Sequence, residues 1–210
     1  MKLYDYFRST TCYRVRIALH LKNIPYEKIS IHLINNGGEQ NSPEYQQINP
    51  QGLVPCLEVE GQQISQSLAI INYLDETVPS PALLPKSPMD KATVLSLALI
   101  IACDMHPLNN LRILNQLKKQ FNPSEEQITE WYHRWLKAGF DAFEAKLQTI
   151  KRSEPFCFGD SVSLADLCLI PQVYNAQRYN FSMDAYPLIN AINQHCLKIA
   201  AFQDAAPEAE

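Results

Sequence analysis

This chain of 210 residues lacks the features that mark several large classes of protein. No basic run is longer than Lys118-Lys119, and the formal net charge is -4, which argues against a nucleic-acid-binding protein. No apolar run approaches the roughly 20 residues that span a bilayer, so no membrane partner is expected. The strand-like first residues predict no cleaved signal peptide and hence a cytoplasmic protein. No internal repeat or low-complexity segment is present, and the length suits one domain or two small ones.

Cysteine motifs are also missing, although the chain has six cysteines. There is no C-x-x-C pair and no metal-ligand spacing with histidine, so neither a dithiol redox centre nor a metal site is predicted. Most of these cysteines are expected to be buried free thiols. Cys12 is the exception, because a helix N-terminus and nearby arginines would lower its pKa. Its possible dithiol partner is absent, since position 15 is Val15.

The first 76 residues predict a β-α-β-α-β-β-α order, which is the topology of a thioredoxin-like α/β domain. Strands are expected at 1–6, 26–33, 56–59 and 63–65, and helices are expected to end near 22, 48 and 75. A proline that enters the third strand of this arrangement is typically cis. The sequence therefore predicts a cis Val54–Pro55 bond, although only about 5–6% of X–Pro bonds are cis.

The second half of the chain predicts an all-α domain. Residues 76–88 contain four prolines and no hydrophobic period, so they should link a first domain, 1–83, to a second, 89–210. A helical run over 90–120 includes Pro107, which should kink it near His106. The pattern Ser163-Leu164-Ala165-Asp166 predicts the capping box of a helix that reaches Arg178. Further helices are expected at 125–150 and 187–197, with a frayed end beyond Gln203.

Two helix starts carry polar side chains that suit an anion. Ser9, Thr10 and Thr11 open the first helix, and Gln66-Ser67 opens the one that begins near residue 68. A helix N-terminus has unpaired N–H groups and partial positive charge. The hydroxyls can either cap these helices or donate hydrogen bonds to a bound thiolate or carboxylate, and both interpretations stay open here.

Several segments, taken in order, form a specific combination. They are Tyr6–Ser9, Tyr13–Leu19, Asn49-Pro50, Val54-Pro55, Gln66–Ile71, His106–Arg112, Ala165–Val173 and Asn175–Arg178. With these segments the chain resembles, over essentially its whole length, the zeta class of the cytosolic glutathione transferases. It departs from the class in one place. The loop is Ser9-Thr10-Thr11-Cys12, whereas the class usually has Ser-Ser-Cys or Ser-Ser-Ala after the arginine.

The resemblance implies a thioredoxin-like domain that binds glutathione, an all-helical domain that binds the substrate, and a homodimer. It also implies a glutathione-dependent isomerase that converts maleylacetoacetate to fumarylacetoacetate in tyrosine and phenylalanine breakdown. In that reaction a thiolate adds to the enone, the resulting single bond rotates, and elimination regenerates glutathione. Alternatives are a maleylpyruvate isomerase, a glutathione transferase that acts on α-halo acids, and a non-catalytic interaction module.

The resemblance also assigns roles to individual residues. Ser9, assisted by Thr10 or Thr11, would stabilise the thiolate. Glutathione would be held by Val54, Pro55, Gln66, Ser67 and Asn109. Carboxylates of the substrate would bind Arg8, Arg112 and Arg178, and His106 with Asn109 could polarise its ketone or enol oxygen. At least one of Arg14 and Arg16 is expected to be structural, because they cannot share a helix face, and Tyr13 is expected to pack in the core.

Overall fold

The computed structural model describes residues 1–150, 152–153 and 155–207. The chain divides into two compact units. Unit 1 consists of Met1–Ala82 with Leu197–Glu210, and unit 2 consists of Leu83–Cys196.

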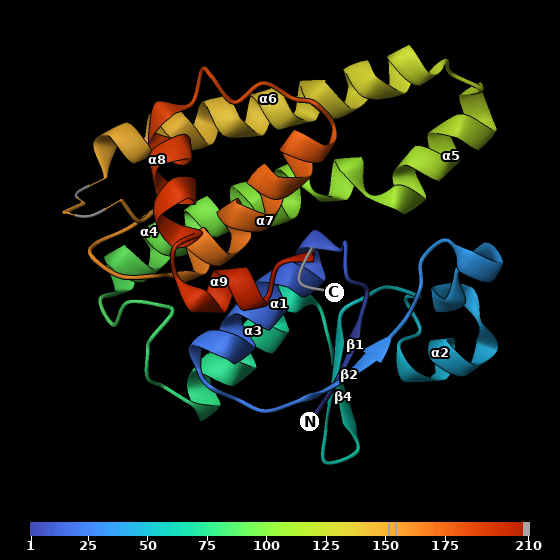
Figure 1. Cartoon of the computed structure of the whole chain (residues 1–210), viewed down its shortest axis with the longest axis horizontal. Coiled ribbons are helices and arrows are strands. Elements are labelled where there is room, and N and C mark those ends of the chain that lie inside the picture. Colours follow the sequence, from blue (N-terminus) through green and yellow to red (C-terminus); the bar gives the residue numbers. More distant parts are fainter. Residues whose placement is uncertain (151, 154, 208–210) are drawn as a thin grey trace. The chain divides into compact units, whose positions relative to one another are not determined.

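Unit 1 is built on a four-stranded mixed sheet with the strand order β2-β1-β3-β4 (Figure 1). β1 and β2 are parallel, and the β1–β3 and β3–β4 pairs are antiparallel. The strands are β1 (Lys2–Asp5), β2 (Glu27–Ser30), β3 (Cys56–Val59) and β4 (Gln62–Ser65). These elements and their order confirm the predicted thioredoxin-like topology.

Helices cover both faces of this sheet because side chains alternate along its strands. Helix α1 (Thr10–Leu21) packs against α3 (Ser67–Thr77), and Figure 1 shows both on one side of the sheet. The short helix α2 (Pro43–Ile48) lies on the other side, where Tyr4 and Tyr45 form an apolar cluster with Cys56. The predicted cis Val54–Pro55 bond is confirmed, and Ser80–Pro81 is also cis, which the sequence reading did not predict.

The C-terminal segment packs on α1, which differs from the predicted placement of 89–210 in one helical domain. Helix α9 (Ala200–Asp204) contacts α1 within unit 1. The Tyr13 hydroxyl donates to the Phe202 carbonyl at 3.0 Å, and Arg16 Nε donates to the Ala205 carbonyl at 2.9 Å. The expected fraying just beyond Gln203 is therefore wrong for Ala205, which is fully buried. Residues 208–210 lie outside the described part of the chain.

The predicted linker, 76–88, is partly helical and is tied to unit 1. Helix α3 ends at Thr77, and the next helix begins at Pro88. The buried Lys22 ammonium donates to Asp75 Oδ1 and to the carbonyls of Val78 and Pro81, at 2.7–2.8 Å. A buried cation needs such partners, so these bonds hold the end of α3 and the start of the linker against Lys22 at the C-terminal end of α1.

Unit 2 is helical, as predicted. Its longer helices are α4 (Pro88–Leu99), α5 (Leu111–Phe121), α6 (Glu125–Thr149), α7 (Leu164–Arg178) and α8 (Pro187–Cys196), which Figure 1 shows. Helix α4 packs against α7, and α8 contacts both α6 and α7. The predicted capping box of α7 is confirmed: Asp166 Oδ2 accepts from the Ser163 N–H and hydroxyl, both at 2.8 Å.

The expected kink at Pro107 takes the form of two irregular turns. A π-helical segment, η3 (Ile100–Met105), is followed by a 3-10 turn, η4 (Pro107–Asn109). The His106 N–H donates to the Ile101 carbonyl at 2.9 Å, five residues back, because Pro107 breaks the regular bonding pattern. Gly139 on α6 makes room for η3, since a Cβ there would lie 2.1 Å from the Met105 Cγ.

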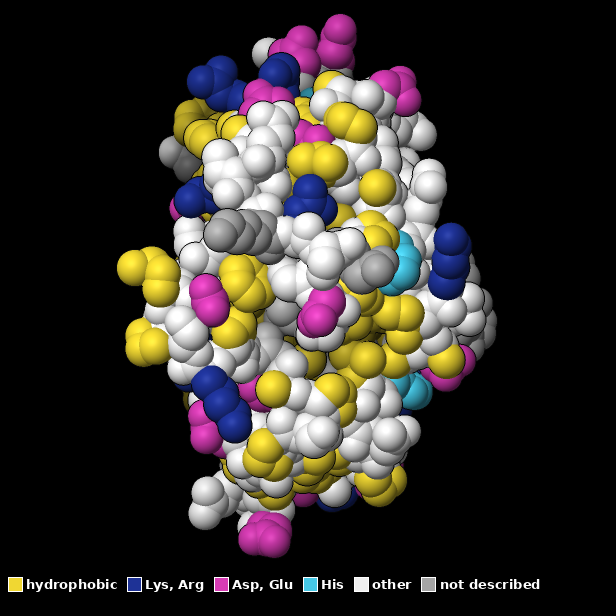
Figure 2. Space-filling model, turned by 90° about the vertical axis from the view of Figure 1, so that its left-hand side faces the viewer, with side chains coloured by type: hydrophobic (Ala, Val, Ile, Leu, Met, Phe, Trp, Pro, Cys, Tyr) yellow, Lys and Arg dark blue, Asp and Glu magenta, His cyan; other side chains and the backbone are white. Residues whose placement is uncertain are grey.

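One helical run in unit 2, Pro88–Phe121, is long and apolar enough to pass a test for membrane spans, which the sequence reading did not expect. Core helices pass the same test. This run contains the irregular turns η3 and η4, and Val94, Leu97 and Ile101 on it are fully buried. On the face that Figure 2 shows, acidic and basic side chains are interspersed.

Candidate functional site

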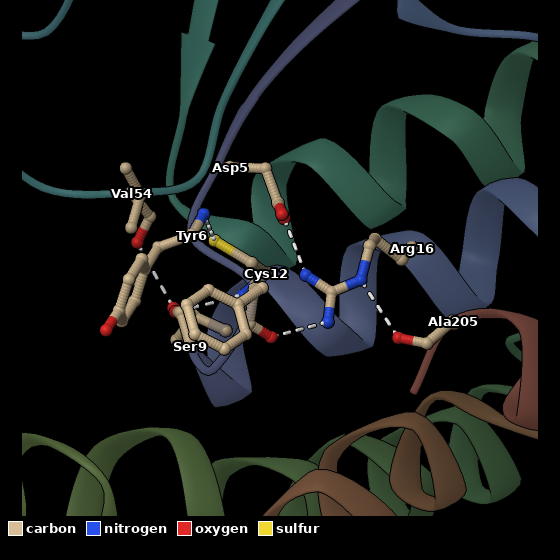
Figure 3. Close-up of polar contacts among 9 residues, drawn as sticks. Asp5, Tyr6, Ser9, Cys12, Arg16, Val54 and Ala205 are labelled. Carbon is tan, nitrogen blue, oxygen red and sulfur yellow. Dashed lines mark hydrogen bonds and ion pairs between the residues drawn. The ribbon is translucent and has the colours of Figure 1, made fainter. Parts of the chain in front are cut away.

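Ser9 is the N-cap of α1 and belongs to a short chain of hydrogen bonds (Figure 3). Its hydroxyl oxygen accepts from the Cys12 N–H at 3.3 Å and lies 2.8 Å from Thr11 Oγ1. Thr11 Oγ1 donates to the Val54 carbonyl at 3.1 Å. Because Thr11 has one hydroxyl proton and directs it to Val54, Ser9 is the donor in the Ser9–Thr11 pair. Of the three predicted catalytic hydroxyls, Thr10 is buried, whereas Ser9 and Thr11 are partly exposed.

Cys12 is directed into unit 1, and the expectation that its pKa is lowered is wrong. Its side chain is fully buried, and its sulfur accepts from the Tyr6 N–H at 3.5 Å. Burial raises the pKa of the Cys12 thiol far above its usual value, and the Asp5 carboxylate adds to this rise. The hydrogen bond from the Tyr6 N–H and the charge of Arg16 lower the pKa, but their effects are smaller. The sequence showed a helix start but not how deeply the sulfur is buried.

Arg16 is structural, which confirms that at least one of the two neighbouring arginines is. Its Nη1 lies 2.7 Å from Asp5 Oδ1 in a buried ion pair, and its Nη2 donates to the Phe7 carbonyl at 2.9 Å (Figure 3). With Nε bound to the Ala205 carbonyl, all three nitrogens of the guanidinium are used. Burial raises the pKa of Asp5, and Arg16 offsets part of that rise. Arg14 and Tyr13 are buried too.

Arg8, in contrast, is exposed at the surface of the same loop. Its guanidinium carbon lies 4.7 Å from the centre of the Phe7 ring, in a cation–π contact. This contact leaves the N–H groups of the guanidinium available to an anion.

The start of α3 is held in an unusual backbone conformation. Gln66 has φ 71°, in the left-handed region that non-glycine residues rarely adopt, and its Nε2 donates to Gln51 Oε1 at 2.8 Å. Gln66 is the N-cap by position, but its side chain makes no cap hydrogen bond, so Gln66 does not cap α3 through its side chain. Ser67 is the first helical residue and is nearly buried. The first N–H groups of α3 therefore lack a side-chain cap from the preceding residue and suit a bound carboxylate.

Four of the predicted residues lie in unit 2, and the structure places two of them in one turn. His106 and Asn109 belong to the irregular segment after η3. Asn109 is buried and donates from Nδ2 to the Tyr132 carbonyl on α6 at 3.1 Å, so it fixes η4 to that helix. Asn110 Nδ2 lies 3.5 Å from His106 Nε2, and Asn110 Oδ1 caps α5 by accepting from the Arg112 N–H.

Arg178 is the last residue of α7 and is exposed, as is Arg112 on the first turn of α5. Arg178 Nη1 donates to Asn175 Oδ1 at 3.2 Å, and its guanidinium carbon lies 5.8 Å from the Tyr174 ring centre. Asn175 is not among the predicted site residues. Its i, i+3 spacing to Arg178 on a predicted helix was the signal that could have identified it.

Comparison with known proteins agrees with this fold. The model of the glutathione S-transferase N-terminal domain matches residues 3–82, and that of the C-terminal domain matches residues 114–199. A probable maleylacetoacetate isomerase of Vibrio cholerae is 44% identical over 98% of this chain and 95% of its own length. A maleylpyruvate isomerase of a Ralstonia species is 44% identical over 100% and 98%.

Solved structures give the same result. A glutathione S-transferase from Legionella pneumophila is 60% identical, with a TM-score of 0.88, over 99% of this chain and 100% of that one. A holo maleylpyruvate isomerase, described as a bacterial zeta-class glutathione S-transferase, is 44% identical with a TM-score of 0.97, over 100% and 98%. A maleylacetoacetate isomerase from Methylobacterium extorquens with bound malonate and glutathione is 37% identical with a TM-score of 0.95, over 100% and 98%.

The chain belongs to the glutathione S-transferase family. Within that family its structural neighbours are zeta-class enzymes, in agreement with the resemblance seen in the sequence.

Proposed function

We propose that this chain is a glutathione-dependent cis–trans isomerase that converts maleylacetoacetate to fumarylacetoacetate in the cytoplasm, as a homodimer. One observation carries the proposal. The thiol at the start of α1, Cys12, is buried with a raised pKa, whereas the Ser9 hydroxyl beside it is partly exposed. A site with an accessible hydroxyl and an inaccessible thiol suits a sulfur that comes from outside the chain. Relatives named maleylacetoacetate isomerase support the choice of reaction.

Residues of unit 1 fit glutathione. The start of α3, with Ser67 and the strained Gln66, would accept the γ-glutamyl carboxylate. The backbone of Val54, before the cis Pro55, would pair with the cysteinyl residue in antiparallel fashion. Asn109 stays a predicted contact; its Nδ2 already donates to the Tyr132 carbonyl within unit 2. When bound, glutathione supplies a thiol that adds to the substrate and is regenerated.

The hydroxyl chain at α1 would favour the ionised form of that thiol. A free thiol has a pKa near 8.5, so only about 3% is ionised at pH 7. The Ser9 proton, which points to Thr11 in the structure, can rotate toward a sulfur anion. Thr11 keeps its own bond to Val54 and so stays in place as Ser9 turns. The α1 N-terminus adds partial positive charge, and Thr10 remains a candidate assistant.

The substrate has two carboxylates, and a chain with net charge -4 must bind them locally. Arg8, Arg112 and Arg178 are exposed, whereas Arg16 is consumed by buried partners. These exposed arginines would bind the carboxylates through their planar forks. His106 would polarise the ketone or enol oxygen. A relative that binds malonate together with glutathione supports a dicarboxylate substrate.

Maleylpyruvate isomerisation is the second candidate, because a relative of that name is as similar as the maleylacetoacetate isomerases. It needs the same thiol and the same arginines, since maleylpyruvate is also a cis enone diacid.

The test is a substrate comparison with glutathione in catalytic amounts. We expect a fumaryl product from maleylacetoacetate without loss of thiol, and a lower kcat/KM with maleylpyruvate. A higher kcat/KM with maleylpyruvate would assign the chain to the second reaction. Thiol consumption with chloroacetate and no isomerisation would make it a transferase instead. Inactivity with all three substrates, in a protein shown to be folded, would favour a non-catalytic module.

A further inference from the structure

The end of α7 carries a hydrogen-bonded relay that none of the predicted roles uses. Arg178 Nη1 donates to Asn175 Oδ1 at 3.2 Å, and Asn175 Nδ2 donates to the hydroxyl oxygen of Tyr132 on α6. A guanidinium has only donors, so Asn175 must turn its carbonyl oxygen toward Arg178. Its amino group then points to Tyr132, whose oxygen accepts. Each orientation in this relay is thus determined by the next group.

The far end of the relay is rigid. Tyr132 is 1% exposed, and its ring stacks on that of Tyr179 with centroids 3.7 Å apart and planes 12° apart. Tyr179 caps the C-terminus of α7, and its carbonyl lies 2.7 Å from His133 Nε2 on α6. Helix α6 therefore holds both the last turn of α7 and the phenol that supports Asn175. Burial raises the pKa of Tyr132, so the phenol stays neutral, and its oxygen accepts from the Asn175 amino group.

The near end of the relay is free to bind. Arg178 is exposed, and one of its nitrogens is engaged by Asn175 while its face lies near the Tyr174 ring. Since a guanidinium offers five N–H donors in a planar fork, most of them stay available for a carboxylate. An exposed arginine without such support must lose rotamer freedom when it binds, which weakens binding.

We propose that Asn175 is a positioning residue that, through Tyr132, holds the Arg178 guanidinium ready for a carboxylate of the substrate. This inference rests on the carboxylate-binding role proposed above for Arg178. Asn175 itself does not touch the substrate in this scheme. Asn175 contributes to substrate affinity, because an Arg178 side chain that is already held in place loses less conformational entropy on binding. The rate of turnover is not affected.

Two substitutions at Asn175 separate positioning from simple packing. Asn175→Ala should raise KM for the dicarboxylate about tenfold and change kcat by less than about twofold. Asn175→Asp keeps the shape but places a carboxylate against Arg178 that competes with the substrate. It should raise KM about 30-fold. A merely structural asparagine would tolerate the isosteric aspartate better than alanine, which is the opposite order. Gln177→Ala, an exposed residue in the same turn, is the matched control.

Tyr132→Phe tests the other hydrogen bond of the relay, because it removes the acceptor of the Asn175 amino group and keeps the buried ring. KM should rise about threefold. Thermal unfolding of each variant shows whether it is folded, and calorimetric titration of the glutathione-loaded protein with malonate gives a readout that needs no turnover. Its Kd should follow the same order of variants as KM.

A double-mutant cycle decides the mechanism. In the Arg178→Ala background, Asn175→Ala should cause no further rise in KM or in the Kd for malonate. An equal further rise there would overturn the positioning role. If Arg178→Ala weakens malonate but Asn175→Ala and Asn175→Asp do not, the inference fails while the proposed function stands. If Arg178→Ala weakens neither substrate nor malonate, the proposed role of Arg178 fails, and the inference fails with it.

Discussion

The start of α1 and the end of α7 differ in what they offer a ligand. The start of α1 presents backbone N–H groups and the neutral Ser9 hydroxyl. The partial positive charge of a helix N-terminus favours an anion there. The end of α7 presents a full cation, Arg178, where the helix dipole stabilises positive charge. In the proposed function, opposite helix termini therefore serve one purpose, which is to bind negative charge. The first does so with a fixed backbone, and the second with a side chain that needs support.

The largest effect is expected from breaking the buried pair that supports the start of α1. Asp5→Ala leaves the Arg16 cation without its partner in the core, so the free energy of unfolding should fall by about 3–5 kcal/mol. Chemical denaturation measures this loss. Arg178→Ala is the control, and its unfolding free energy should stay within about 0.5 kcal/mol of the wild type because that side chain is exposed. Equal losses of unfolding free energy in the two variants would mean that the buried Arg16 contributes no more to stability than the exposed Arg178.

The next largest effect concerns the hydroxyl at α1. Ser9→Ala should lower kcat about 100-fold with little change in KM, because its proton is proposed to act on the reacting sulfur. It also removes an N-cap, so a loss of about 1 kcal/mol in stability accompanies it. Steady-state kinetics at a temperature well below unfolding separates the two effects. An unchanged kcat would leave Ser9 as a helix cap only.

Arg178→Ala should give the converse pattern. We expect KM for the dicarboxylate to rise about 30-fold, which is about 2 kcal/mol, while kcat changes little. Comparing the changes in kcat and KM between Arg178→Ala and Ser9→Ala shows whether the start of α1 acts on turnover and the end of α7 on substrate affinity. A fall in kcat with KM unchanged would reverse the roles.

The smallest effect is expected at Cys12. Iodoacetamide at pH 8 should modify the exposed Cys103 and leave Cys12 unmodified in the folded protein, since the Cys12 thiol is buried and its pKa is raised. Peptide mass spectrometry identifies the modified residue. Rapid labelling of Cys12 without denaturant would mean that the start of α1 opens, and the contrast between an accessible hydroxyl and a hidden thiol would fail.

Local signals predicted most of the fold. The capping box at Ser163 and Asp166, the hairpin into β4 and the cis Val54–Pro55 bond each depend on residues close in sequence, or on a topology that those residues define. What local signals missed depends on distant partners. Asn175 is 43 residues from Tyr132, and Arg16 is 189 from Ala205, so no spacing rule could pair them.

The candidate site divides in the same way. Ser9 and Thr11 were identifiable because a helix start has a sequence pattern. The shift in the pKa of Cys12 was predicted in the wrong direction, because a sequence pattern shows which charges lie near a thiol but not how deeply the thiol is buried. The segment around His106 was predicted as a simple kink, whereas the structure has a π-helical segment before it, in which Met105 packs closely against Gly139 of α6.

The bonds from α1 to the C-terminal segment have a consequence for biosynthesis. A ribosome releases β1 and α1 first, yet the Tyr13 hydroxyl and Arg16 Nε donate to the carbonyls of Phe202 and Ala205, which are translated almost 190 positions later. Until those carbonyls emerge, these two hydrogen bonds of α1 cannot form. The tertiary hydrogen bonds of α1, the first helix to be made, should therefore form last. In a chain that stops shortly before Phe202, the amides of α1 should exchange hydrogen faster than in the full chain.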